Sequence, residues 1–450
     1  MRRLLPPVLI EKDASGTTFI AVERHDVPLA YAGICSPGGM SVPHPSGLNE
    51  IAAGLLSEGS SKTDSLRWRT HLDRHAIGLS VWPSEIFWSI GVDSLSIDFS
   101  MAVDAMADLA ASPRMPQSEW KRLVKERETA AASAWRSPQF ILHWMSQIQL
   151  LGRGHANAAP GVVGGFKALK FEDAEKTGRT AFGYGPGAAI YACGDIDPAK
   201  TIDMLRQTFS NLPSTRKLLP LREPRYFRPT TWIVDAPMSQ VFFAISRRGI
   251  RRGDPDRLAL RLFNRALGGG FSSRLFRSTR EEFGQTYHIS SSLSEGHQDH
   301  PFSIRSFTET DKLGAMLYHI YKTLLEVRDD GFTEEEIDAA REGLSGSLPL
   351  SLTSPTAVLW HVFDGWESHL TPAQLEEEWL ALRDVSREAV NAAARRILGD
   401  LSYQLTLVGP EGKMRYFLQH RPLGIATIPI NDVGQARYWP KDLYDPATYM

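Results

Sequence analysis

Residues 267–287 read Leu267-Gly268-Gly269-Gly270-Phe271-Ser272-Ser273-Arg274-Leu275-Phe276 and, three residues later, Arg280-Glu281-Glu282-Phe283-Gly284-Gln285-Thr286-Tyr287. The guanidinium of Arg280 is permanently charged and forked, and the phenol of Tyr287 donates a hydrogen bond without carrying a charge. Together, two such donors can hold an oxygen atom on which negative charge develops during a reaction. In the alternative interpretation, Arg280 pairs with Glu281 or Glu282, and Tyr287 packs in a core.

The three glycines that precede this pair allow two interpretations. Because Gly268, Gly269 and Gly270 have no Cβ, they would let the backbone of a bound peptide approach closely. They would equally serve as the turn that ends a helix. We predict that they bind substrate, and the helix-end interpretation stays open beside it.

The stretch resembles the C-terminal half of M16 metallopeptidases, the pitrilysin and insulinase class. In that family an Arg and a Tyr at this spacing reach a substrate held at a zinc ion. The resemblance covers about residues 5 to 412 and includes Tyr184-Gly185-Pro186-Gly187-Ala188 and Asp235-Ala236-Pro237-Met238-Ser239-Gln240. It implies an α+β fold of two homologous halves, each a mostly antiparallel or mixed sheet packed with helices. It also implies a clam-shell of two chains, with the zinc of one chain facing the Arg/Tyr pair of the other.

The zinc-binding half of this pattern is degenerate. The family's zinc helix reads roughly Gly-Leu-x-His-x-x-Glu-His-x-Leu-x-x-Gly and matches residues 47–59. Glu50, Ala53 and Gly54 stand at the positions of His, Glu and His. A catalytic zinc site needs three protein donors, an open position and a nearby base, and neither Ala53 nor Gly54 supplies a donor. The frame around them is kept by Gly47, Leu48, Leu56 and Gly59.

Other residues do not complete a metal site. The family's third ligand, a Glu, falls near Ala130, with Glu126 and Glu128 close by. His71 and His75 have helical i, i+4 spacing, but no Glu accompanies them and they match a solvated helix face. We therefore predict no metal in this chain and, by the resemblance, zinc in a partner subunit.

Composition limits the class of protein. The chain has 450 residues, 42% of them hydrophobic, which is too long for one core, so we expect two or more domains. Because 50 basic residues oppose 52 acidic ones, we expect neither nucleic acid nor an anionic membrane as a partner. No apolar run approaches the roughly 20 residues of a membrane helix. Cys35 and Cys193 lie in apolar, strand-like contexts and are expected to be small buried thiols.

The N-terminal segment does not read as a secretion signal. Arg2 and Arg3 are basic, but Pro6 and Pro7 interrupt the apolar run, which stops at Glu11. We expect a cytoplasmic location, with the periplasm as the alternative.

Matching landmarks indicate an internal duplication with a period of about 215 residues. We predict an N-terminal domain over residues 1–214, a proline-rich linker over 215–229, and a C-terminal domain over 230–450 that ends in a tail. The paired landmarks are Met115 and Phe332 (332 − 115 = 217), Gly194 and Gly409 (409 − 194 = 215), and Leu55 and Leu267 (267 − 55 = 212).

Residue patterns predict the main elements of both halves. Asp197 and Pro198 are placed to cap and begin a helix. Strands are expected at 17–22, 28–35, 79–82, 86–92, 189–194, 231–235, 241–247 and 403–408. Helices are expected at 101–110, 119–134, 140–151, 198–209, 256–266, 311–327 and 333–346.

The resemblance implies a zinc-less subunit that pairs with an M16 chain carrying an intact His-x-x-Glu-His motif and acts with it on peptides. In that role Arg280 and Tyr287 would bind the substrate and transition state at the partner's zinc. The first alternative is a structural or peptide-binding oligomer subunit without peptidase activity. The second is an autonomous peptidase with an unorthodox metal site, which Ala53 and Gly54 argue against.

Overall fold

The computed structural model shows two compact units. Unit 1 comprises Met1–Ala130, Gly161–Arg222 and Pro349–Glu376, and unit 2 comprises Ala131–Pro160, Glu223–Leu348 and Glu377–Met450. The residues that the structure describes are 4–41, 45–152, 155, 158, 160–215, 229–282, 284, 286–298, 300–418 and 425–429. Most of the predicted linker and most of the C-terminal tail lie outside them.

Unit 1 contains a six-stranded sheet with the order β1-β2-β6-β3-β5-β4. Neighbouring strands are antiparallel except β2 and β6, which run parallel. The strands are β1 (Val8–Lys12), β2 (Thr18–Glu23), β3 (Leu29–Pro37), β4 (Gly78–Pro83), β5 (Phe87–Leu95) and β6 (Ala189–Gly194).

Unit 2 contains a sheet with the order β13-β7-β12-β8-β11-β9, and β10 pairs with β8 outside this path. β7 runs parallel to both β12 and β13, whereas the pairs β12–β8, β8–β11 and β11–β9 are antiparallel. The strands are β7 (Thr231–Asp235), β8 (Gln240–Arg251), β9 (Ile289–Leu293), β10 (Glu295–Gly296), β11 (His300–Glu309), β12 (Gln404–Gly409) and β13 (Ile425–Pro429). The described part of the predicted tail is therefore a strand, β13, on the edge of this sheet.

Helices complete both units. Asp197 accepts a hydrogen bond from the Lys200 N–H, and Pro198 begins α7, as predicted. The α-helices are α1 (Leu48–Leu56), α2 (Ser65–Arg74), α3 (Phe99–Ala111), α4 (Gln117–Ala134), α5 (Pro138–Leu151), α6 (Phe171–Arg179), α7 (Pro198–Phe209), α8 (Arg257–Gly268), α9 (Arg274–Phe276), α10 (Leu313–Asp329), α11 (Glu334–Ser351), α12 (Pro355–Glu367), α13 (Pro372–Ala381), α14 (Arg387–Leu398) and α15 (Glu411–Leu418).

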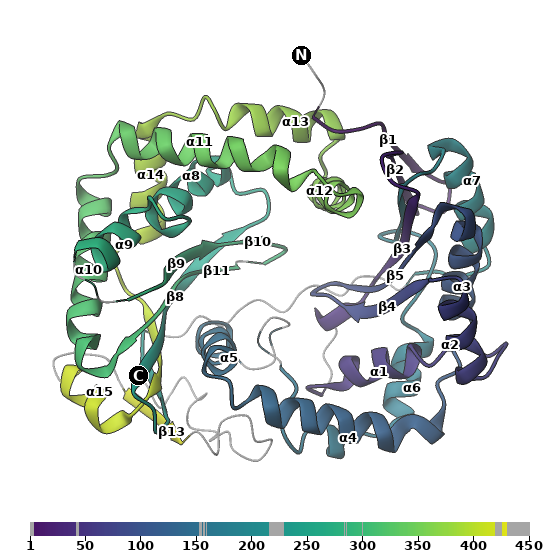
Figure 1. Ribbon diagram of the computed structural model, residues 1–450, viewed down its shortest axis with the longest axis horizontal. Helices are drawn as coiled ribbons and strands as arrows, with labels where there is room; N and C mark the ends of the chain where they lie inside the picture. Colours follow the sequence, from purple (N-terminus) through teal and green to yellow (C-terminus); the bar gives the residue numbers. More distant parts are fainter. Residues whose placement is uncertain are drawn as a thin grey trace. The chain divides into compact units, whose positions relative to one another are not determined.

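In unit 1, helices cover both faces of the sheet (Figure 1). α3 contacts β5 and α7 contacts β2 over the main core, which includes Phe19, Ile34 and Phe209. α12 packs on the opposite face, where its Phe363 ring lies 5.5 Å from the ring of Tyr191 on β6. Two cores on one sheet explain why the strand β6 is buried throughout.

In unit 2, α8, α10 and α14 pack over one core, and α5 covers the opposite face of the sheet along β8 and β12 (Figure 1). The alternation of side chains along β8 separates the two faces. Phe243 and Ile245 enter the core beneath α8, whereas Phe242 stacks on Phe307 of β11 on the other face.

The duplication is visible in the structure. β2-β6-β3-β5-β4 and β7-β12-β8-β11-β9 have the same order and the same pattern of parallel and antiparallel pairs. Pro138 and Pro355 begin equivalent helices, α5 and α12 (355 − 138 = 217). The prediction of an α+β fold with two similar mixed sheets is confirmed.

The equivalent helices α5 and α12 are exchanged between the units: each packs in the unit whose sheet is formed by the other repeat. α5 comes from the first repeat but packs in unit 2, and α12 comes from the second repeat but packs in unit 1. Boundaries at residues 214 and 230 therefore separate the strands of the two sheets, but they do not separate these helical segments.

The buried side chain of Gln149 anchors α5 to the sheet of unit 2. Its amide nitrogen donates to the Thr230 carbonyl oxygen at 2.9 Å, and its amide oxygen accepts from the Thr406 hydroxyl at 2.6 Å. Gln149 is only 1% exposed, so water cannot replace these partners. Gln147, on the same helix, has a buried amide oxygen with no hydrogen-bond partner in the described structure.

We predict that Gln149→Leu destabilises the protein by about 1 to 3 kcal/mol, because it removes the hydrogen bonds to Thr230 and Thr406 and leaves the buried Thr406 hydroxyl without its acceptor. The measurement is the urea denaturation curve, with exchange of the α5 amide hydrogens as a local readout. Gln147→Leu is the matched control and should change stability by less than about 0.5 kcal/mol. Equal effects of the two substitutions would contradict the anchoring role of Gln149.

Candidate functional site

The segment that carries Arg280 follows α8 and forms short helical turns. α9 continues directly into a π-helical turn, η5, at Arg277–Glu282. Such turns widen a helix by one residue and occur frequently at functional sites. Within this segment the Thr279 hydroxyl is buried and donates to the Leu275 carbonyl oxygen at 2.7 Å.

Both predicted donors are exposed. Arg280 lies on the solvent side of η5, and its guanidinium stands 4.8 Å from the centroid of the Phe276 ring. Tyr287 is 82% exposed and lies just before β9. The alternative interpretation of Tyr287 as a core residue is therefore wrong. The side chains of Glu281 and Glu282 lie outside the described structure, so the predicted alternative pairing of Arg280 stays a prediction.

Glu336 at the start of α11 anchors the segment beneath Arg280. Its carboxylate accepts hydrogen bonds from Arg274 at 2.8 Å, from Arg277 at 2.5 Å and from the Thr333 N–H at 3.0 Å. Burial by itself would raise the pKa of Glu336, but these hydrogen bonds and the two positive charges hold that pKa below its ordinary value. The carboxylate is therefore ionised at neutral pH, and it ties α9 and η5 to α11.

Two of the three glycines, Gly268 and Gly269, have a packing explanation within unit 2. A Cβ on Gly268 would lie 2.6 Å from the Ser291 backbone nitrogen, and a Cβ on Gly269 would lie 2.8 Å from the Cα of Arg265. Arg265 in turn donates to the Gly269 carbonyl oxygen at 2.5 Å. Gly269, which caps α8, has φ −88°, so the helix does not end in a left-handed residue. Peptide binding by Gly268, Gly269 and Gly270 stays a prediction.

The degenerate zinc motif lies on α1, as its Gly-Leu frame predicts. Ala53 is buried there, and a Cβ on Gly54 would lie 3.3 Å from Leu123 Cδ2 and 3.9 Å from Arg127 Nη2 of α4. A guanidinium thus stands beside the position where the family motif has its second His. Its positive charge opposes a divalent cation at the same place.

Glu50 faces this arginine instead of a metal. Burial raises the pKa of Glu50, and the charge of Arg127 and a hydrogen bond from the Gly161 N–H offset part of that rise. The residues therefore do not fit zinc: one carboxylate beside a guanidinium replaces three donors and an open position. Arg127 has no counterpart in our sequence predictions, because only the packing of α1 against α4 brings it to the motif.

The other carboxylates and histidines considered for a metal have different partners. Glu126 pairs with Arg122 at 2.8 Å, and Glu128 accepts hydrogen bonds from two backbone N–H groups. His71 is exposed on α2, whereas His75 caps that helix and lies 3.0 Å from Asp98. Among the described residues, no group of three His, Cys, Asp or Glu side chains could hold a metal ion.

Both cysteines are buried thiols, as predicted. Cys35 Sγ lies 3.2 Å from the Ser89 hydroxyl, and Cys193 donates to the Pro355 carbonyl oxygen at 3.0 Å. Burial raises the pKa of each thiol to about 12, so neither is a reactive thiolate at neutral pH. Within the described residues, no helix is both long and apolar enough to cross a membrane.

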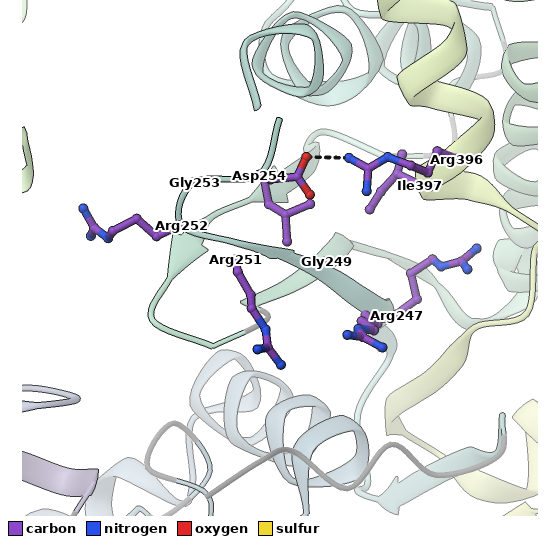
Figure 2. Close-up of a pocket in the computed structure, with 10 residues that line it drawn as sticks. Arg247, Gly249, Arg251, Arg252, Gly253, Asp254, Arg396 and Ile397 are labelled. Carbon is purple, nitrogen blue, oxygen red and sulfur yellow. Dashed lines mark hydrogen bonds and ion pairs between the residues drawn. The ribbon is translucent and has the colours of Figure 1, made fainter. Parts of the chain in front are cut away.

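An arginine-rich pocket in unit 2 is a feature that our sequence analysis missed (Figure 2). It encloses about 520 Å³ between the end of β8, the turn that follows it and the end of α14. The sequence signal was the repeated doublet Arg247-Arg248 and Arg251-Arg252. The lining residues are Arg247, Arg248, Gly249, Ile250, Arg251, Arg252, Gly253, Asp254, Arg396 and Ile397.

Comparisons with known proteins agree with the fold and concern mainly M16 peptidases. The family profile described as the peptidase M16 inactive domain matches residues 185–344. The uncharacterized zinc protease YmxG of Bacillus subtilis is 23% identical over 376 residues, which cover 83% of this chain and 90% of that protein. The non-peptidase homolog YmxG of Helicobacter pylori is 23% identical over 340 residues, or 73% of this chain and 77% of that protein.

Among solved structures, the peptidase M16 inactive domain from Pseudomonas fluorescens has the same fold. Its TM-score is 0.82 at 22% identity, over 90% of this chain and 98% of that one. The matching profile, the relatives that extend over most of the sequence and the shared fold make this chain similar to M16 peptidases, and the helix at the position of their zinc-binding helix lacks the metal-binding residues.

Proposed function

We propose that the chain is the non-catalytic subunit of a two-chain M16 peptidase. It contributes Arg280 and Tyr287 to substrate and transition-state binding in the site of a partner that carries the intact His-x-x-Glu-His motif. The zinc of that partner supplies the activated water. Peptides or short unfolded polypeptides are the substrate class, and this chain itself holds no metal.

The observation that carries the proposal is the exposure of both donors, with Arg280 on an anchored segment. Arg280 and Tyr287 point to solvent, while the carboxylate of Glu336 holds the turns beneath Arg280 in place. Long exposed side chains gain little stability from such a position. A fixed segment beneath an exposed donor such as Arg280 is useful when that donor binds a ligand outside the chain, because the donor is then already in position.

The chemistry of the two donors fits the hydrolysis of a peptide bond. When water adds to the scissile carbonyl, negative charge builds on its oxygen, and donors that are already in place lower the barrier. The guanidinium of Arg280 can donate two parallel hydrogen bonds, and the phenol of Tyr287 can donate one. One donor can take the oxyanion while the other holds a neighbouring substrate carbonyl.

A structural or peptide-holding subunit without peptidase activity is the second candidate. The replaced zinc donors and the name of the Helicobacter pylori relative, a non-peptidase homolog, support it. The two proposals differ in one measurable respect. Only the first makes the turnover of a complex depend on Arg280 and Tyr287.

We predict that Arg280→Ala or Tyr287→Phe lowers the turnover of the complex about 10²- to 10³-fold, equivalent to about 2.7 to 4 kcal/mol, as expected for the loss of one preorganised donor. Arg280→Lys should restore little, since an ammonium lacks the planar fork. Peptide turnover is measured with the complex confirmed intact by size-exclusion chromatography and its zinc content unchanged.

Arg328→Ala and Tyr318→Phe are matched controls for these substitutions. Arg328 pairs with Asp329 at the surface and Tyr318 is exposed on the same helix, α10, so both should leave turnover unchanged. Near-wild-type turnover of both Arg280→Ala and Tyr287→Phe would reject the catalytic proposal and favour the structural one.

Glu336 is predicted to act as a positioning residue. Glu336→Gln removes the charge that binds Arg274 and Arg277, so α9 and η5 should loosen and turnover should fall by about tenfold, less than for Arg280→Ala. Because the folded-state pKa of Glu336 is lowered, its contribution to stability is present at neutral pH and lost as the pH falls through that pKa. Hydrogen exchange of residues 274–282 checks the loosening. Unchanged exchange in the variant would contradict this role.

Metal content and assembly provide a further test. Purified alone, the chain should contain no stoichiometric zinc and hydrolyse no peptide, because Glu50, Ala53 and Gly54 do not form a three-donor site. Co-expressed with an M16 chain that carries the intact motif, it should form a stable 1:1 complex. About one tightly bound zinc per isolated chain, with chelator-sensitive activity, would refute the proposal. So would a monodisperse monomer under co-expression.

A further inference from the structure

Arg305 on β11 is a half-buried arginine that the function proposed above does not use. Its Nε atom is buried and has no acceptor. In the part of the chain that the structure describes, its side chain makes neither a hydrogen bond nor an ion pair. Burial lowers the pKa of Arg305, and among the described residues no carboxylate offsets that effect. A guanidinium still stays charged at neutral pH, so β11 carries a positive charge that lacks a counter-ion.

The strand register explains why no acidic group reaches Arg305. Its cross-strand neighbours are Ala244 on β8 and Ser290 on β9. The next residues of β11 on the same face are Ser303 and Phe307. None of these four side chains can supply a negative charge. The face is the one that α5 covers, but α5 packs along β8 and β12, so Arg305 lies beside that helix, toward the β9 edge of the sheet.

Polar groups of α5 lie on the side of this charge. The charge of Arg305 acts on His143, and burial and that charge together lower the pKa of His143 to about 4. The imidazole is therefore neutral at neutral pH and carries one N–H that can donate. Gln147 lies one turn further on the same side of α5, and its buried amide oxygen has no partner among the described residues. Arg305 and His143 thus offer donors, and Gln147 offers an acceptor.

The chemistry of these groups indicates what would complete them. An unpaired charge in a half-buried place costs free energy, so a carboxylate gains more from pairing with it than from pairing with a fully exposed arginine. The guanidinium fork also matches the two oxygens of a carboxylate. An inorganic anion would satisfy only the donors. A peptide that carries a carboxylate supplies both acceptors and N–H donors.

Arg305 also lies near the proposed donor Tyr287 in the chain path of the same sheet. Its cross-strand neighbour Ser290 follows Tyr287 by three residues (290 − 287 = 3), which span at most about 11 Å between Cα atoms. Adjacent strands lie about 5 Å apart. An extended peptide of about five residues is therefore long enough to reach from Tyr287 to Arg305.

We propose that Arg305, together with His143, binds a carboxylate of the peptide substrate within about five residues of the cleaved bond. Arg305 is then a specificity-determining residue. This inference rests on the proposed function, because it takes the bound ligand to be the peptide that is cleaved. The carboxylate belongs to an acidic side chain or to the C-terminus of the peptide, and both present the same two oxygens to the guanidinium.

Isothermal titration calorimetry with the isolated chain tests this binding without requiring turnover. The probes are a blocked heptapeptide with one central Glu, the same peptide with Gln in its place, and the Gln peptide with a free C-terminal carboxylate. We expect a carboxylate peptide to bind at least about tenfold more tightly than the blocked Gln peptide, because it forms charge-assisted hydrogen bonds. The tighter of the two carboxylate peptides identifies the source of the group.

Arg305→Met should abolish this preference, and Arg305→Lys should retain only part of it, since an ammonium lacks the planar fork. Arg395→Met is the charge-matched control and should keep the preference, because Arg395 is exposed on α14, which packs on the opposite face of the sheet. Urea denaturation separates binding from stability. Arg305→Met removes an unpaired charge, so its unfolding midpoint should equal or exceed that of the wild type.

Equal binding of all three peptides by the wild-type chain would overturn the inference, and so would a preference that survives Arg305→Met. A lowered unfolding midpoint of Arg305→Met would make Arg305 a structural residue instead. The turnover of the complex separates this inference from the proposed function. A carboxylate preference without any dependence of turnover on Arg280 and Tyr287 would refute the proposed function and leave the carboxylate site. That dependence without a carboxylate preference would refute the carboxylate site alone.

Discussion

The strand that follows the helical block of each repeat, β6 or β12, lies in the interior of its sheet, and the rest of the structure depends on this placement. β6 pairs with β2 on one side and β3 on the other, and β12 lies in the same way between β7 and β8. The helical block separates β6 and β12 from their partner strands in the sequence, so pairing them joins residues that lie far apart in the chain. In unit 2, β12 also carries Thr406, to which the buried Gln149 of α5 binds. The central strand β12 thus pairs with β7 and β8 within the sheet and also binds the helix that covers one face of the sheet.

The two repeats keep this frame but have diverged in their chemistry. In the first, α1 retains the Gly-Leu frame of a zinc helix, while the positive charge of Arg127 acts on Glu50 where metal donors would be needed. In the second, Arg280 stands exposed on turns that Glu336 anchors, and Tyr287 is exposed just before β9. Loss of the metal donors leaves the frame intact because the frame depends on buried apolar packing, and polar donors contribute little to it.

Unit 2 carries two distinct features at the two ends of α8. The arginine-rich pocket lies at the turn before Arg257, and the segment with Arg280 follows Gly268. A helix of 12 residues spans about 18 Å, so the two features lie apart on one rigid element.

The sequence by itself determined the identity of the replaced zinc donors, the duplication with a period of about 215 residues, and most strands and helices. These properties depend on residue type, spacing and local capping, as at Asp197 and Pro198. The tertiary structure alone decided which distant groups meet. Glu336 reaches Arg274 across 62 positions, and the exchanged helix α5 binds Thr406 across 257 positions. Local periodicity carries no information on such pairings, because they arise only when separate elements bury a common face.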